Sequence, residues 1–157
     1  MDLGAAADGL VPRVVGFDVG DKRIGVAVTD PLGYTAQPLF TLQRGSKRAD
    51  LKAIGRVLRK QGASEAVVGN PLYMSGDQSP QAAKAQAFAQ DLRAEFGITV
   101  HLWDERLTTT EAHRHLDEGG HARGHERRGV IDQVAAVMIL QGWLEWRRNA
   151  AIDSSVV

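Results

Sequence analysis

The chain has 157 residues, a length that suits a single domain with its own hydrophobic core. It contains no cysteine, which excludes disulfide bonds, zinc–thiolate sites and a thiol nucleophile. Because 19 basic and 19 acidic residues cancel, attraction for a polyanion has to come from local basic clusters. We expect one domain over residues 1–157, with flexible ends at 1–12 and 149–157. The start does not resemble a signal peptide and no apolar stretch could cross a bilayer, so we expect a cytoplasmic protein.

The first part of the chain predicts three strands. The segments at 13–19 and 24–30 are apolar and rich in β-branched residues, and they flank a turn of sequence GDKR. This pattern is typical of a β-hairpin. A third strand is expected near residues 37–42, before a basic cluster at Arg44, Lys47 and Arg48.

Helices and strands then alternate. Apolar residues at helical spacing from Leu51 to Leu58 predict a helix that ends at Gly62, and residues 66–69 form a short buried strand. Ser79 and Pro80 predict the start of a second helix, which ends at Gly97. A further strand follows over 98–103.

The last part of the chain predicts two helices separated by a basic loop. Thr108 and Glu111 have the spacing of a capping box for a helix through about Asp117. Residues 119–129 are rich in Gly, His and Arg and predict a loop that we expect to be a mobile substrate-binding flap. A helix is predicted to follow over about 131–147. The order of elements predicts an α/β fold, with a mixed five-stranded sheet and helices on both faces.

Three acidic residues stand where apolar or small residues are expected. Asp18 lies inside the first strand, Glu105 follows the fifth strand beside Asp104, and Asp132 lies in the first turn of an otherwise apolar helix. We expect the first and fifth strands to be adjacent, with the last helix beginning over them, so that the three carboxylates converge. Their repulsion and desolvation would then require cations, and Mg²⁺ or Mn²⁺ prefers such oxygen ligands. Two ions can hydrolyse a phosphodiester with an activated water, Asp18 bridging them while Glu105 and Asp132 each complete one site.

Each acid also has a simpler interpretation. Asp132 could complement the dipole of its helix, and Asp104 and Glu105 could belong to a solvated loop. Asp18 could open a glycine-containing turn. Acids are rare inside strands, however, and the three together favour a catalytic metal site.

Several nearby residues are candidates for contacts with substrate. Gly20 and Gly25 would let a phosphate backbone approach, or they are ordinary turn and packing glycines. Arg106 could hold a phosphate or pair with Asp104, and Tyr73 with Met74 could stack on a base or form a packing cluster. Trp143 and Trp146 could pack the last helix or a subunit interface. The candidates for substrate binding are Gly20, Lys22, Arg23, Asn70, Arg106, Arg127 and Arg128.

Four segments carry a resemblance to a known family: GFDVGDKRIGVAVTD, VVGNPLYMSG, WDERLTT and VIDQVAAVMIL. In order and spacing they resemble the YqgF/RuvX family, from about Arg13 to Glu145. Its members are described as Holliday junction resolvases and as pre-16S ribosomal RNA nucleases. The resemblance implies an RNase H-like fold and a metal-dependent nuclease that acts in pre-16S rRNA 5′-end processing or in DNA recombination and repair. It places the family's metal-binding acids on Asp18, Glu105 and Asp132.

The chain departs from the related RuvC-type resolvases at one position. Those enzymes have a second Asp three residues further along the last helix, where this chain has Ala135. The resemblance therefore implies phosphodiester hydrolysis more strongly than junction resolution, and it leaves RNA or DNA as the substrate. Cutting a symmetric junction would suit a homodimer.

Two other classes of protein stay open from the sequence. An actin-like or sugar-kinase-type ATP-binding domain uses a similar Asp-x-Gly hairpin, but it needs two such domains, and this chain has no Gly-x-x-x-x-Gly-Lys-Ser/Thr loop. A catalytically silent RNA-binding factor of ribosome assembly would not need the carboxylate set.

Overall fold

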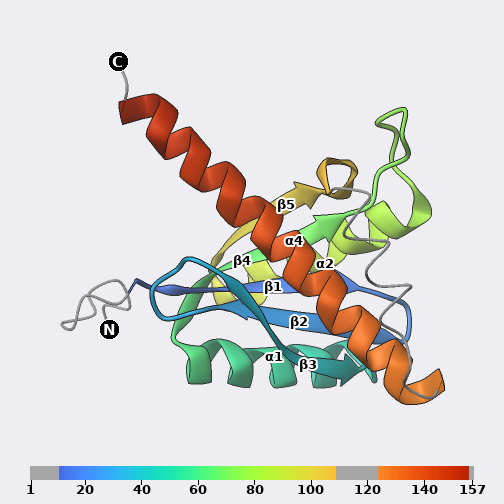
Figure 1. Ribbon diagram of the computed structural model, residues 1–157. Helices are drawn as coiled ribbons and strands as arrows, with labels where there is room; N and C mark the ends of the chain where they lie inside the picture. The colour runs from blue at the N-terminus through green and yellow to red at the C-terminus, as the bar shows by residue number, and fades with distance from the viewer. Residues whose placement is uncertain (1–10, 109–123, 156–157) are drawn as a thin grey trace.

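The computed structural model describes residues 11–108 and 124–155 and shows a mixed sheet of five strands (Figure 1). The strands lie in the order β3-β2-β1-β4-β5. β1 pairs antiparallel with β2, and β2 with β3, whereas β4 runs parallel to β1 and β5 parallel to β4. The strands are β1 (Arg13–Val19), β2 (Arg23–Thr29), β3 (Ala36–Gln43), β4 (Ala63–Asn70) and β5 (Thr99–Asp104).

Helices cover both faces of this sheet. α1 (Lys47–Gln61) and α2 (Pro80–Phe96) pack on one face, and α4 (Gly124–Ser155) crosses the other. A short 3₁₀ turn, η1 (Glu105–Leu107), follows β5. Figure 1 shows the C-terminal part of α4 extending past the edge of the sheet. None of the helices in the described ranges combines the length and the apolar character that a bilayer span requires.

The helix ends follow the capping signals in the sequence. The Ser79 side chain accepts a hydrogen bond from the amide of Ala82, and Pro80 occupies the first turn of α2. Gly62 and Gly97 end α1 and α2 in the left-handed conformation that glycine adopts without steric cost. These predicted boundaries are confirmed.

The last helix differs from the prediction. α4 begins at Gly124 and runs to Ser155, so the predicted loop is wrong over 124–129 and the predicted end near Arg147 is too early. The prediction relied on apolar residues at helical spacing, and these occur only over 131–147. Only this part of the helix crosses the sheet and has to bury one face. The predicted helix that follows Thr108 and the start of the flap, at 109–123, lie outside the described residues.

Alternation along the strands divides the interior into two cores. Val15 and Phe17 point toward α1 and α2, where the Phe17 ring meets Phe88 edge-on with centroids 5.4 Å apart. Val14 and Val67 belong to the second core, which packs against α4. Since side chains alternate along β1, Asp18 lies on the α4 face.

The expected adjacency of the first and fifth strands is wrong. β4 lies between them, with Phe17 aligned with Val68 and Val68 aligned with Leu102. The reason is topological: β4 follows α1 and takes the free edge of β1, and the next crossover through α2 then places β5 beyond β4. The carboxyl ends of these three parallel strands nevertheless lie at one edge of the sheet.

Candidate active site

Three acidic side chains from three different elements meet at this edge of the sheet. Asp18 is near the end of β1, Glu105 begins η1 directly after β5, and Asp132 lies on α4 where it crosses β2. The negative charge of Asp132 raises the pKa of Asp18, and the charge of Asp18 raises the pKa of Glu105. Asp18 is thus electrostatically coupled to both other acids.

Gly69 allows Glu105 to reach across the intervening strand. A Cβ atom at this position of β4 would lie 3.0 Å from Oε2 of Glu105 and 2.5 Å from Cδ1 of Ile139. A real side chain would therefore push the carboxylate away from Asp18 or lift α4. The sequence analysis missed this role, although a glycine that ends an apolar strand run is a signal of close approach.

Gly25 allows the backbone of α4 at Asp132 to lie close to β2 beside Asp18. It is the register partner of Asp18 on β2, and a Cβ atom there would overlap the carbonyl oxygen of Asp132. Of the two interpretations of this glycine, the structure shows the packing role, because the backbone of α4 occupies the space left for a phosphate.

Burial shifts the protonation of two of the acids. Loss of solvent, followed by the charge of Asp132, raises the pKa of Asp18 from 3.8 to about 6. Loss of solvent also raises the pKa of Glu105 from 4.5 to about 7, with smaller contributions from Asp18 and Asp104. A desolvated group of carboxylates with raised pKa values is what a bound cation would stabilise.

The three acids influence one another electrostatically, but their side chains are not arranged as a complete set of metal ligands. In the ranges that the structure describes, no three Asp, Glu, His or Cys side chains are close enough together to hold a metal ion as they stand. One side chain is also already engaged, since Nε of Arg23 donates to Oδ2 of Asp132 at 2.7 Å. Side-chain movement is therefore required before an ion can take all three carboxylates.

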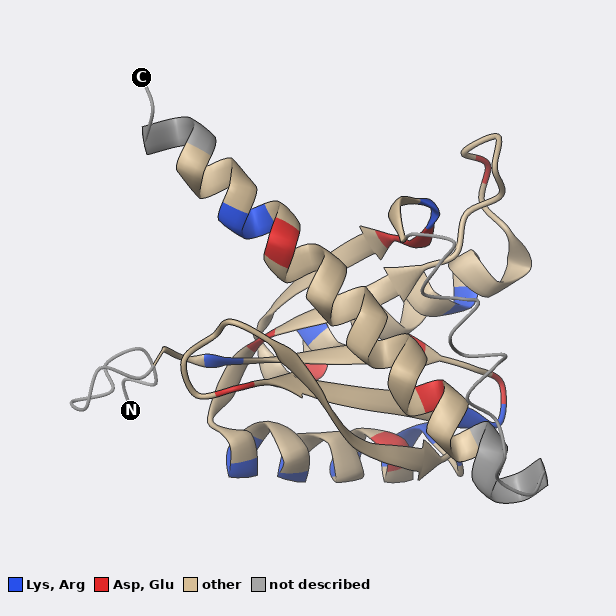
Figure 2. Cartoon of the chain, in the orientation of Figure 1, with Lys and Arg blue, Asp and Glu red and all other residues tan. Residues whose placement is uncertain are grey.

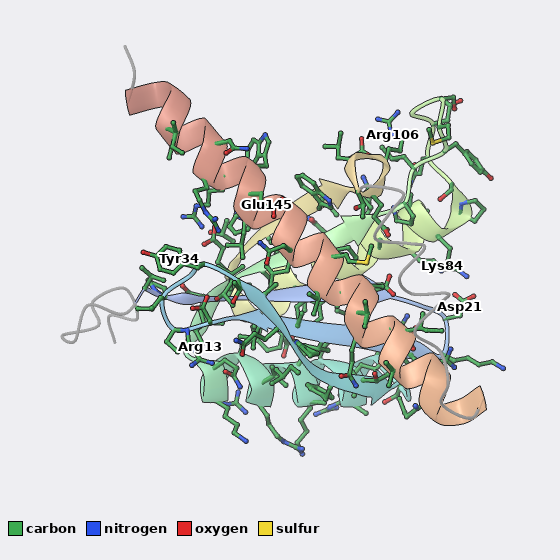
Figure 3. All side chains as sticks on the ribbon, in the orientation of Figure 1. Arg13, Asp21, Tyr34, Lys84, Arg106 and Glu145 are labelled. Atoms are coloured by element: carbon green, nitrogen blue, oxygen red, sulfur yellow. The ribbon has the colours of Figure 1, made fainter. Side chains whose placement is uncertain are left out.

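The β1–β2 turn carries three of the predicted substrate contacts. The Gly20 amide donates to the Arg23 carbonyl at 2.9 Å and closes the turn. Lys22 is exposed on it, whereas Arg23 faces Asp132. Figure 3 shows Lys84 reaching from α2 to Asp21 on the same turn, and their ion pair of 2.7 Å holds the turn against α2.

Asn70 and Arg106 are engaged within the protein. The side-chain oxygen of Asn70 accepts a hydrogen bond from Gln86 of α2 at 3.1 Å. The Arg106 guanidinium pairs with Asp104 at 2.6 Å and lowers the pKa of that carboxyl. Between the two interpretations of Arg106, the structure shows the pair with Asp104.

The loop after β4 projects apolar side chains into solvent beside η1. Tyr73 is 53% exposed and Met74 is 85% exposed, so they do not form the packing cluster that was the alternative to stacking on a base. Arg106 donates to the Met74 carbonyl at 3.3 Å and ties the loop to the end of β5 (Figure 3).

The basic clusters contribute less free positive charge than the sequence suggested. Arg44 and Lys47 pair with Asp50 and Asp91, at 3.3 and 3.0 Å. Figure 2 shows Lys and Arg spaced along α1, whereas the part of α4 that crosses the sheet is uncharged from residue 133 to 144. The side chains of Arg127 and Arg128 lie outside the described residues.

The two tryptophans of α4 have different environments. Trp143 is buried and its ring lies 4.9 Å from the ring of His101 on β5, which confirms helix packing for this residue. Trp146 is 56% exposed. A subunit interface involving Trp146 stays a prediction.

Comparison with known proteins identifies the family. A family model described as "RuvX: Holliday junction resolvase" matches residues 12–146. The chain belongs to the RuvX family. This RuvX-family chain is 53% identical over 133 residues to a Moorella thermoacetica protein named "Putative pre-16S rRNA nuclease", covering 85% of this chain and 94% of that protein. A Myxococcus xanthus protein of the same name is 48% identical over 141 residues, covering 90% and 93%.

A solved structure supports the fold of this RuvX-family protein. It resembles T. thermophilus RuvC in complex with a Holliday junction substrate, with a TM-score of 0.50 and 15% identity over 87% of this chain and 96% of that one. At this level of identity the likeness concerns the fold alone, and it confirms the predicted RNase H-like α/β architecture. The family assignment also separates the chain from the kinase and actin-like class.

Proposed function

We propose that this chain is a nuclease that hydrolyses phosphodiester bonds in nucleic acid and that Asp18, Glu105 and Asp132 carry the reaction. Membership of the RuvX family supports the activity. The observation that supports the residues is their coupling at one sheet edge, where the pKa values of Asp18 and Glu105 are raised to about 6 and about 7. A fold gains no stability from burying such a group unless another charge compensates it.

The chemistry of the donor set fits a hard divalent cation. All three side chains offer carboxylate oxygens, which are the ligands that Mg²⁺ and Mn²⁺ prefer, and the chain has no sulfur ligand from cysteine. We propose that these three side chains would hold the cations, with Asp18 contributing to both of two ion sites and Glu105 and Asp132 to one each. Such ions, when bound, supply Lewis-acid chemistry at a phosphate and an acidified water. The protein's part is to orient Asp18 and Glu105 and to keep them away from bulk water, and the raised pKa values mean that a bound ion would displace their protons.

The proposed substrate is a ribosomal RNA precursor, in line with the names of the relatives. We propose that Lys22, which is exposed on the β1–β2 turn, attracts phosphate, and that Gly20, Asn70, Arg106, Arg127 and Arg128 are candidates for the rest of the path. A four-way DNA junction is a second candidate, because the family description names it. Ala135, at the position of a second Asp in RuvC-type resolvases, makes it the weaker one.

A cleavage panel tests the proposal. The purified protein is incubated with a structured 16S rRNA precursor, single-stranded RNA, single-stranded DNA and a four-way junction, each with Mg²⁺ and with Mn²⁺. We expect cleavage of the precursor, and we expect Asp18→Asn and Asp132→Asn to abolish it while circular dichroism shows an intact fold.

The matched control is Asp91→Asn, which removes one carboxylate from α2 where it pairs with Lys47. We expect it to cleave like the unaltered protein. Cleavage retained by Asp18→Asn or by Asp132→Asn would refute the assignment of the acids. Cleavage of the junction alone would reverse the order of the two substrates.

A further inference from the structure

The ion pair between Arg23 and Asp132 lies inside the carboxylate site rather than on the open surface. Nε of Arg23 is 2.7 Å from Oδ2 of Asp132, and the two side chains are only 24% and 19% exposed. This pair places a guanidinium on one of the three acids that the proposed function assigns to a cation. The guanidinium and the cation therefore compete for the same carboxylate oxygen.

The backbone on both sides of the pair is held in place. Arg23 begins β2 and shares its α4-facing side with Gly25, and the turn before it is closed by a hydrogen bond from Gly20. On the α4 side, Thr41 of β3 donates to the carbonyl of Gly129 at 2.7 Å. The side chain of Gln133 donates to Thr41 at 3.1 Å.

These contacts hold the part of α4 around Asp132 on the sheet, immediately before and after this residue. The carboxylate cannot leave Arg23 through a shift of the helix without breaking them. The long side chain of Arg23, which starts from the first residue of β2, is the part that can rotate.

We propose that Arg23 is an exchangeable counter-ion: it occupies Asp132 in the cation-free protein and releases it when a divalent cation binds. The proposal rests on the proposed function, because it takes Asp132 as a cation ligand. Once released, the guanidinium would stay near Asp132, because the backbone of Arg23 is held in β2. There it can donate to a phosphate oxygen, a role that its planar array of donors suits.

The exchange predicts that removing the guanidinium strengthens cation binding. A partly exposed ion pair is weak, so the expected rise in affinity is about two- to five-fold for Arg23→Gln. Arg23→Lys keeps a positive charge beside Asp132 and should stay close to the unaltered protein. If Arg23 merely braced the structure, the Gln variant would instead lose affinity, because Asp132 would be held less firmly.

Calorimetric titration with Mn²⁺ measures this affinity without any substrate. The matched control is Lys22→Gln, which removes the same charge from the same turn but leaves the Arg23–Asp132 pair intact. Its effect on Mn²⁺ affinity should be clearly smaller than that of Arg23→Gln. Thermal unfolding of each variant without metal confirms that all of them fold.

A second readout follows the guanidinium itself. In a ¹⁵N-labelled sample, the arginine Nε–H signal that disappears in Arg23→Gln belongs to Arg23. We expect this signal to shift when Mg²⁺ is added, and to stay in place when the same charge is added as Na⁺.

The outcomes separate the two proposals. Equal or weaker Mn²⁺ binding by a folded Arg23→Gln protein, or an Arg23 signal that ignores Mg²⁺, would overturn the exchange and leave the nuclease proposal standing. If neither protein bound Mn²⁺ or Mg²⁺, the cation site itself would be refuted, and the exchange with it.

Discussion

Replacing Asp18 by Asn should make the cation-free protein more stable, although it removes the central acid of the site. The carboxylate lies in β1, shielded from water and coupled to Asp132, and both effects raise its pKa from 3.8 to about 6. A raised pKa in an acid means that the folded protein holds the charged form at a cost. An amide of nearly the same shape avoids that cost.

The pKa shift sets the size of the effect. With about 1.4 kcal/mol for each pKa unit, a rise from 3.8 to about 6 corresponds to about 3 kcal/mol against folding at pH values above both. This is an upper limit, because a buried amide also needs hydrogen-bond partners. We expect a gain of about 1–3 kcal/mol, or a rise in Tm of about 3–10 °C for a domain of this size.

The dependence on pH has a definite sign. Between the unfolded and folded pKa values, the folded protein holds more protons on Asp18 than the unfolded chain does. The contribution of Asp18 to the stability of the unaltered protein therefore falls as the pH rises from about 4 to about 6 and then levels off. The advantage of Asp18→Asn should be largest near pH 8 and about half as large near pH 5.

Differential scanning calorimetry with a chelator present measures both values. The control is Asp21→Asn on the neighbouring turn, where Lys84 lowers the pKa of the carboxyl, so that this change should not stabilise the protein. Mg²⁺ should then raise the Tm of the unaltered protein but not that of Asp18→Asn. A variant that is less stable than the unaltered protein at both pH values would refute the electrostatic account of Asp18.

Three further outcomes follow from the same geometry. Gly69→Ala should cost about 1–3 kcal/mol of stability and weaken Mn²⁺ binding, because its Cβ meets Ile139 and Glu105. Gly45→Ala serves as the calorimetric control, since the nearest neighbour of its Cβ would be 4.0 Å away. Ser79→Ala should cost about 1 kcal/mol in urea unfolding through loss of the α2 cap, with cleavage retained. Mg²⁺ affinity, measured by calorimetry, should fall as the pH drops through about 7, because the pKa of Glu105 is about 7 and its proton competes with the ion. An affinity that does not change from about pH 8 to 6 would contradict this.

Local signals in the sequence predicted most of the fold. The ends of α1 and α2 are marked by Ser79, Pro80, Gly62 and Gly97, whose effects act over a single turn and need no tertiary information. Strand order is different in kind. β4 separates β1 from β5 because of which strand edge is free when each segment folds back onto the sheet. The residues of β1 and β5 do not by themselves indicate this order.

The same division applies to the site. Asp18, Glu105 and Asp132 could be singled out as candidates because each stands where an apolar or small residue is expected. The contributions of Gly69 and Arg23 depend on elements that are distant in the sequence, although a glycine that ends an apolar strand run is a signal of close approach. Gly69 matters because Glu105 passes over it, and Arg23 because α4 returns to β2 after a hundred residues of chain.

The two cores explain how the fold tolerates an acid in a central strand. β1 is bordered by β2 and β4, and its apolar side chains are buried against α1 and α2 on one face and α4 on the other. Asp18 therefore cannot relax toward water by a local shift of the strand, since such a shift would expose Phe17 and Val19. The cost of the carboxylate, about 3 kcal/mol at most, is small beside the burial that holds it. The rigid packing thus keeps Asp18 in a position where a divalent cation would neutralise its charge, beside Asp132, which already pairs with Arg23.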